Sequence, residues 1–240
     1  MFLTGVSIFF LYFYLKNQMS SKYEYNYVPV ENDVQDTTTE AWVKLCEYVE
    51  IIAEKGLTEF NLGEAIDAKY WSHIHTLPPS IAKLKKVKKL FLYGSNIKRI
   101  PPEIGEMDAL EEFTPYTSYN LHWFPYEITN CKRLKNSTVS TRALYGNYKY
   151  RKPFPDLKDN PVTYDKEMIA CSVCSKPIKQ SETEQWWISI GIATDVLPLL
   201  VNVCSNSCKK ALPKPAKGYL QYPHKGAKNL GQPPRDEWYR

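Results

Sequence analysis

The sequence is poor in the residues that build common catalytic sites. Its 240 residues include 10 glycines and 4 histidines. The glycines do not form a loop that could cradle a phosphate, and no nucleophile elbow or catalytic pair is present. These absences argue most strongly against nucleotide hydrolysis. We therefore expect a protein that is not an enzyme and that has no small-molecule substrate.

Long apolar segments are also missing. Residues 2–15, FLTGVSIFFLYFYL, carry no charge, but a helix that spans a membrane needs about 20 residues. The segment has no basic region before it and no small-residue cleavage site, so it does not resemble a signal peptide. We expect the protein to start at Met19 and to be cytoplasmic. The alternative is a membrane anchor formed by residues 2–15 if Met1 is the true start.

Most of the chain has no excess of charge of either sign. The net charge of +5 comes from the C-terminal end, because residues 209–240 hold eight basic and two acidic side chains. Such a segment can contact nucleic acid or anionic lipid, or it can be a solvated tail that aids solubility. We expect the solvated tail, and contact with nucleic acid is the alternative.

An amphipathic helix is predicted over residues 40–55. The segment EAWVKLCEYVEIIAEK repeats apolar residues at helical spacing. The threonines at 37–39 offer hydroxyl groups that can cap its start, and Gly56 is typical of a helix end. The residues before it, 20–36, are polar and rich in tyrosine, and we expect them to form a loose arm.

Four segments after this helix share one pattern. LTEFNL begins at Leu57, VKKLFL at Val87, LEEFTP at Leu110 and LKNSTV at Leu134. Each fits an apolar-x-x-apolar-x-apolar frame with lapses, and each is followed by a proline-bearing segment: TLPPSIAKL, RIPPEIGEM, WFPYEITNC and PFPDL. The starts are 30, 23 and 24 residues apart, and the last two spacings lie in the range of leucine-rich repeats.

Residues 57–157 therefore resemble the leucine-rich repeat family. The resemblance implies an α/β fold class: a short solenoid with the helix at 40–55 as its N-terminal cap. Pro115 and Ser137 stand where the pattern calls for apolar residues, so we expect a short and shallow array.

In this geometry the residues between the apolar positions face outward on the concave side. They form a candidate surface for binding another protein: Lys89, Phe91, Tyr93, Glu112, Thr114 and Tyr116. The alternative is that the arm or the C-terminal unit covers them.

Four cysteines form two close pairs. Cys171 and Cys174 are a CxxC pair, Cys204 and Cys208 are a CxxxC pair, and 29 residues separate the pairs. Such spacings let one local turn supply two thiolates to a tetrahedral zinc ion. Disulfides, which need an oxidising compartment, and inert buried cysteines are the alternatives. We expect structural Zn²⁺, because four thiolates leave no open position for a catalytic water.

The segments between the pairs, EQWWISI and LPLLVNV, are predicted strands, and CSNSCKKAL is predicted to begin a short helix. This order resembles the treble-clef zinc fingers, and VCSNSC is similar to the TRASH and FCS/MYM-type group. The resemblance covers about residues 170–212 and implies the four cysteines as ligands.

The predicted organisation has four parts. Residues 1–36 hold the apolar start and the arm, 37–157 the capping helix and repeats, 158–212 the β-rich zinc module, and 213–240 a basic tail that contains proline. We expect a module that binds another protein. The alternatives are an adaptor that contacts nucleic acid through the zinc module and tail, and an immunity-type protein of a bacterium, which rests on analogy alone.

Overall fold

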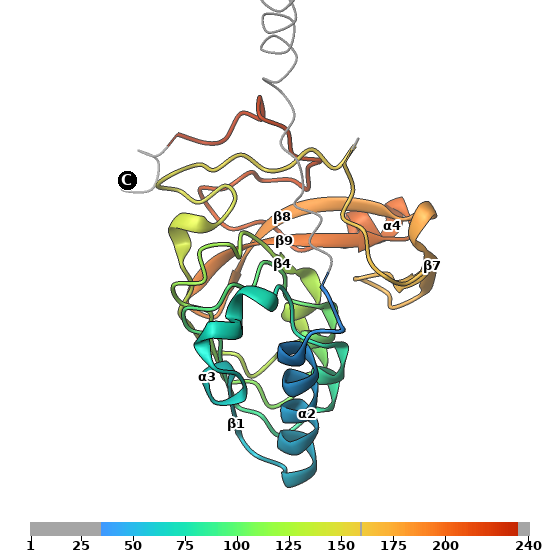
Figure 1. The fold of residues 1–240 in the computed structure, drawn as a ribbon. Helices are drawn as coiled ribbons and strands as arrows, with labels where there is room; N and C mark the ends of the chain where they lie inside the picture. The colour runs from blue at the N-terminus through green and yellow to red at the C-terminus, as the bar shows by residue number, and fades with distance from the viewer. Residues whose placement is uncertain (1–34, 159, 235–240) are drawn as a thin grey trace, which may run out of the picture.

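A computed structural model describes residues 35–158 and 160–234 of the chain (Figure 1). The apolar segment 2–15, the expected start at Met19 and nearly all of the arm at 20–36 lie outside the described residues. Within the described part, none of the helices combines the length and the hydropathy that a membrane span requires.

Helix α2 (Glu40–Lys55) lies where the periodicity predicts it. The Thr39 hydroxyl accepts a hydrogen bond from the Trp42 backbone N–H at its start. Gly56 ends the helix with a φ of 61°, a left-handed conformation that glycine adopts without strain. One face of the helix is buried and consists of Ala41, Leu45, Val49 and Ile52. The predicted helix and its two caps are confirmed.

Four short parallel strands follow α2 and form a sheet in the order β1–β2–β3–β5. Their bounds are β1 (Glu59–Asn61), β2 (Lys89–Phe91), β3 (Glu112–Thr114) and β5 (Asn136–Ser137). The register aligns the central residues Phe60, Leu90 and Phe113, and all three are fully buried. Because side chains alternate between the two faces of a strand, the residues on either side of each central position point out of the core.

Three 3-10 helices stack on one another and pack against the same core. They are η2 (Pro79–Lys83), η3 (Pro102–Glu106) and η4 (Tyr126–Asn130). Each begins directly after a proline and buries one isoleucine: Ile81, Ile104 and Ile128. The fixed φ of proline suits the first turn of such a helix. Further short helices lie in the connections: α3 (Leu62–Ala65), η1 (Ala68–His73) and η5 (Thr141–Ala143).

A second sheet contains the longest strands. β8 (Glu184–Ile192) and β9 (Asp195–Val203) form an antiparallel hairpin, and β4 (Phe124–Pro125) pairs in parallel with β9. Every residue of β9 from Leu197 to Val203 is buried. The two strands predicted between the cysteine pairs are therefore confirmed. One core cluster includes residues of α2, of the parallel sheet and of this hairpin.

The prediction of a leucine-rich repeat solenoid as the fold class is wrong. The described residues form a mixed α/β fold in which the parallel sheet has only four strands, each two or three residues long. Stacking stops at β5, because the Ser137 N–H donates to the Thr194 hydroxyl and the Ser137 hydroxyl donates to Asp195 of the hairpin. The apolar frame in the sequence describes how one strand places its side chains. The frame does not determine how many strands form the sheet or which part of the chain covers the last strand.

The chain after the hairpin runs back across β8. The backbones of Trp187 and His224 exchange two hydrogen bonds, of 2.8 and 3.0 Å, and the Ala216 N–H donates to the Ser189 carbonyl. The prediction of a solvated tail is therefore wrong for residues 213–234. Apolar side chains lie among the lysines of this segment, and their burial fixes it in place: Tyr219 and Leu220 are buried together with the His224 imidazole.

Candidate metal centre

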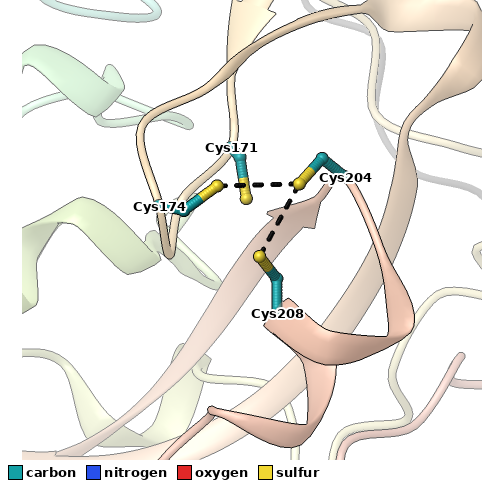
Figure 2. A group of neighbouring side chains, drawn as sticks. All are labelled: Cys171, Cys174, Cys204 and Cys208. Atoms are coloured by element: carbon teal, nitrogen blue, oxygen red, sulfur yellow. Dashed lines mark hydrogen bonds between the residues drawn. The ribbon is translucent and has the colours of Figure 1, made fainter.

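Two separate turns bring the four cysteines to one place (Figure 2). The first lies between strands β6 (Met168–Ala170) and β7 (Pro177–Lys179), which pair antiparallel. Within it the Cys171 N–H donates to the Lys176 carbonyl, and the Ser175 N–H donates to the Cys171 carbonyl. These bonds form a tight knuckle that carries Cys171 and Cys174.

The second turn joins the end of β9 to the short helix α4 (Asn206–Lys210). Cys204 directly follows β9, and Cys208 lies in the helix. The Ser205 hydroxyl caps the helix by accepting a hydrogen bond from the Cys208 N–H, and the short helix lies where the sequence predicts one. We refer to residues 168–179 and 204–210 together as the cysteine finger.

The four sulfur atoms lie within 4.8 Å of one another. The Cys204 sulfur is 3.6 Å from the sulfurs of both Cys174 and Cys208. A tetrahedral zinc ion with Zn–S bonds of about 2.3 Å would separate its sulfurs by about 3.8 Å, so the spacing fits such an ion. All four cysteines are free thiols, and separations of 3.6 Å are far longer than the roughly 2.05 Å of a disulfide bond.

Local hydrogen bonds favour the thiolate form of Cys171. Its burial opposes ionisation, but backbone N–H groups of Cys174, Val173 and Cys204 donate to its sulfur and outweigh burial. The pKa of Cys171 is lowered to about 7 as a result. A thiolate is the form that binds metal.

Cys208 shows the opposite behaviour. The Ser205 hydroxyl favours its ionisation, but hydrogen bonds with the thiols of Cys174 and Cys204 outweigh this effect and raise the pKa of Cys208 to about 12. Four sulfurs this close cannot all carry a negative charge unless a cation compensates them. A divalent metal ion supplies that charge and converts coordinating thiols to thiolates.

Two hydrogen bonds connect the first turn of the cysteine finger to the end of β9, just before the second turn. The Ser172 N–H donates to the Asn202 carbonyl at 2.7 Å, and the Asn202 N–H donates to the Ser172 hydroxyl at 3.0 Å. These contacts fix Cys171 relative to Cys204. Sequence reasoning does not find them, because neither residue belongs to a recognisable ligand pattern and they are 30 positions apart.

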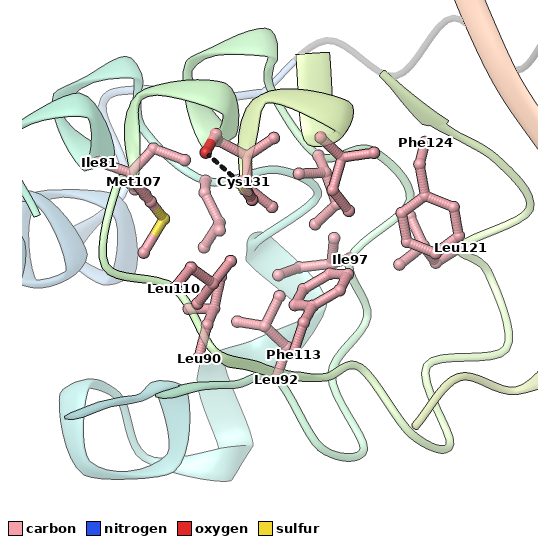
Figure 3. Close-up of a cluster of buried hydrophobic side chains, with 14 of the residues drawn as sticks. Ile81, Leu90, Leu92, Ile97, Met107, Leu110, Phe113, Leu121, Phe124 and Cys131 are labelled. Atoms are coloured by element: carbon pink, nitrogen blue, oxygen red, sulfur yellow. Dashed lines mark hydrogen bonds between the residues drawn. The ribbon is translucent and has the colours of Figure 1, made fainter. Parts of the chain in front are cut away.

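The remaining two cysteines lie elsewhere. Cys131 is buried in the core, where its thiol donates to the Ile104 carbonyl (Figure 3). Burial raises its pKa to about 12, so it stays a neutral thiol. Cys46 lies on α2 and is half-buried. Neither residue belongs to the group of four cysteines.

The residues predicted to bind a protein lie on the outward face of the parallel sheet. Tyr93 and Tyr116 are 60% and 45% exposed, and their ring centroids are 5.9 Å apart. Lys89 forms an ion pair of 2.7 Å with Glu59 on the neighbouring strand. Phe91, Glu112 and Thr114 are half-buried. None of the described residues covers the two tyrosine rings completely, so the structure brings an accessible aromatic pair to this face.

Neither a protein-family model nor a curated protein matches this chain. The clustering of the four cysteines is shown by the structure, and it is compatible with a metal site. The identity of the ion stays a prediction that rests on the donor set and its geometry.

Proposed function

We propose that this protein is a non-enzymatic module that binds another protein and that its cysteine finger is held by a structural zinc ion. The observation that carries the zinc assignment is the convergence of four free thiols, with all sulfurs within 4.8 Å of one another. Sulfur ligands in tetrahedral arrangement are typical of zinc or of iron–sulfur clusters. The order of knuckle, hairpin and helix, which resembles treble-clef fingers, supports zinc.

The donor set also supports a structural role for the ion. Four thiolates fill the coordination sphere of tetrahedral zinc and leave no position for a substrate or a catalytic water. The finger itself has few apolar side chains to bury: the residues of β6 and β7 are exposed or half-buried, and α4 has no buried residue. A small unit of this kind depends on its metal for folding.

The proposed contact surface is the aromatic pair on the sheet. Exposed tyrosines are anchors in many protein interfaces, because they bury a large area and lose few rotatable bonds. The ion pair of Lys89 and Glu59 joins β2 to β1 in the same sheet and adds polar groups to it. We infer that a protein partner binds across β2 and β3 and covers Tyr93 and Tyr116.

Capture of partners by the full chain tests this surface. Proteins retained by the wild type are compared by quantitative mass spectrometry with those retained by the Phe91→Ala/Tyr93→Ala variant. Tyr222→Ala serves as a matched control, because Tyr222 is also exposed, at 54%, but lies in the C-terminal segment. Partners lost only with the first variant support the proposal, and equal capture by all three proteins contradicts it.

Nucleic-acid binding through residues 209–240 has weaker support. The ammonium groups of Lys209 and Lys225 lie 3.2 and 4.0 Å from the centroid of the Trp186 ring. Lys225 also donates a hydrogen bond to the Gln185 carbonyl. These lysines already have partners within the fold. Nucleic-acid affinity that falls steeply with salt concentration would restore this alternative.

A further inference from the structure

A cleft of about 600 Å³ lies between the stacked 3-10 helices and the segment that leads into the cysteine finger. One wall consists of the proline-bearing helices and includes Pro79, Pro102 and Pro125. The other wall consists of residues 164–166 and 168–172 with Asn202 of β9. The volume of the cleft is in the range of sites that bind small molecules, about 300–1,000 Å³. No motif in the sequence predicts it, because its walls are far apart along the chain.

Two contacts hold the walls in place. The Lys166 ammonium forms an ion pair of 2.8 Å with Glu103 of η3, and the Arg99 guanidinium donates a hydrogen bond of 3.0 Å to the Thr163 carbonyl. The first contact connects the segment before the finger to η3, and the second connects it to the chain just before η3. The cleft is therefore built by tertiary contacts and is formed before any ligand enters.

Glu127 is the unusual residue of the cleft. It lies on η4 and lines the cavity. Its Oε2 atom is buried and makes no hydrogen bond to any described residue. Burial raises the pKa of Glu127, and the nearby Glu103 adds to this effect, whereas a hydrogen bond with Ser172 opposes it. A buried carboxyl oxygen without a partner is costly, and a ligand that pairs with it removes that cost.

The rest of the lining favours a positively charged ligand. Three aromatic side chains line the cleft, Trp42, Trp123 and Tyr164, and aromatic faces attract organic cations. Acidic side chains outnumber basic ones in the lining, which contains Glu103, Glu106, Glu127 and Asp165 against Arg99 and Lys166. Two of the acids already form ion pairs, Glu103 with Lys166 and Glu106 with Lys85, so the negative charge offered to a ligand comes from Glu127 and Asp165. Lys166 pairs with Glu103 and Arg99 donates to the Thr163 carbonyl, and the Oε2 atom of Glu127 makes no hydrogen bond to any described residue.

We propose that the cleft binds a small organic cation, an ammonium group carried on an apolar body, whose nitrogen pairs with Glu127. The ammonium donates to the unpartnered Oε2 atom, and a hydrogen bond to a charged acceptor is stronger than one between neutral groups. The apolar body lies against the proline and tryptophan lining. This site is separate from the sheet face proposed for a protein partner and does not depend on it.

A series of three compounds with one aromatic ring and different charge tests the proposal. The full chain, with its metal retained, is titrated by calorimetry with phenethylammonium, 2-phenylethanol and phenylacetate. The cation is expected to bind at least tenfold more tightly than the other two. Indole N–H signals of Trp42 and Trp123 in the NMR spectrum are expected to shift on its addition, which locates the compound in the cleft.

The Glu127→Gln variant keeps the shape of the side chain and removes its charge. It is expected to lose the preference for the cation, whereas Glu54→Gln, on the exposed side of α2 and outside the cleft, is expected to keep it. The proposal is overturned if the alcohol or the anion binds the wild type as tightly as the cation does, or if no compound binds. It is equally overturned if the Glu127→Gln variant retains the tenfold preference. The wild-type series decides the question even if a variant fails to fold.

Discussion

Two regions of the molecule are stabilised in different ways. One is the half around the parallel sheet, and the other is the cysteine finger. The sheet half has a dense core in which Leu90, Phe113 and Phe124 are fully buried (Figure 3). In the finger, the strands β6 and β7 expose their outer residues, and the one buried cysteine is Cys171. Burial of apolar surface stabilises the first region, and we propose that a metal ion stabilises the second. Each region should therefore respond to a perturbation that leaves the other intact.

Removal of the metal has the largest expected effect, and it is confined to the finger. Binding of structural zinc contributes on the order of 10 kcal/mol to the folding of small zinc domains. Cys204→Ser, or a strong chelator, is expected to collapse the NMR signals of residues 168–179 while those of β1, β2 and β3 persist. Cys46→Ser is the matched control, because Cys46 lies outside the cluster. Unchanged NMR signals of the finger after chelation would contradict the proposal that a metal ion stabilises it.

A cavity in the core has the next largest effect and acts on the sheet half. Phe113 is fully buried and packs edge-to-face against Phe124 with ring centroids 5.9 Å apart. Phe113→Ala is expected to lower the free energy of unfolding by about 4 kcal/mol. Val43→Ala on the exposed side of α2 is expected to change it by less than about 0.5 kcal/mol. Urea denaturation measures both, and equal effects would show that Phe113 is not part of a tightly packed core.

Acid is expected to destabilise a third region, where the C-terminal segment packs on β8. Burial lowers the pKa of His224 to about 4, from about 6.5 in an unfolded chain. Between these values the unfolded state binds more protons than the folded state. The free energy of unfolding therefore falls as the pH falls from about 6.5 to about 4, by about 3 kcal/mol in total. Urea denaturation across this range measures the slope. The same slope in His224→Gln would show that other groups cause it.

Loss of the exposed aromatic pair has the smallest expected effect on stability. Tyr93 and Tyr116 are largely outside the core, so replacing both with alanine is expected to change the free energy of unfolding by less than about 1 kcal/mol. Binding of the partner should nevertheless be lost. Thermal denaturation and partner capture on the same samples separate the two effects. A large loss of stability would mean that the tyrosine pair stabilises the sheet. Loss of partner capture in this variant would then be no evidence for a binding role.

Local features could be predicted from the sequence. Helix α2, its caps at Thr39 and Gly56, and the two strands of the hairpin follow from periodicity and from residue preferences within a few positions. The spacing of the cysteine pairs also identified the four residues that the structure brings together. In each case the decisive interactions join residues that are close in sequence or that belong to a known ligand pattern.

Features that depend on distant contacts could not be predicted. Ser137 ends the parallel sheet through its bonds to the hairpin, and the backbone of His224 anchors the C-terminal segment to Trp187. The partners in each contact are tens of residues apart, and no local pattern joins them. The cleft around Glu127 is of the same kind, because its walls meet only in the folded chain.

The metal content of the purified full chain tests the central claim most directly. Elemental analysis of protein prepared without chelator, combined with titration of the free thiols before and after denaturation, gives the ion and the state of the cysteines together. We predict about one zinc per chain, held by four reduced thiols that become reactive when the metal is removed. A zinc content near zero, or the finding that Cys171, Cys174, Cys204 and Cys208 are joined in disulfides, would contradict it.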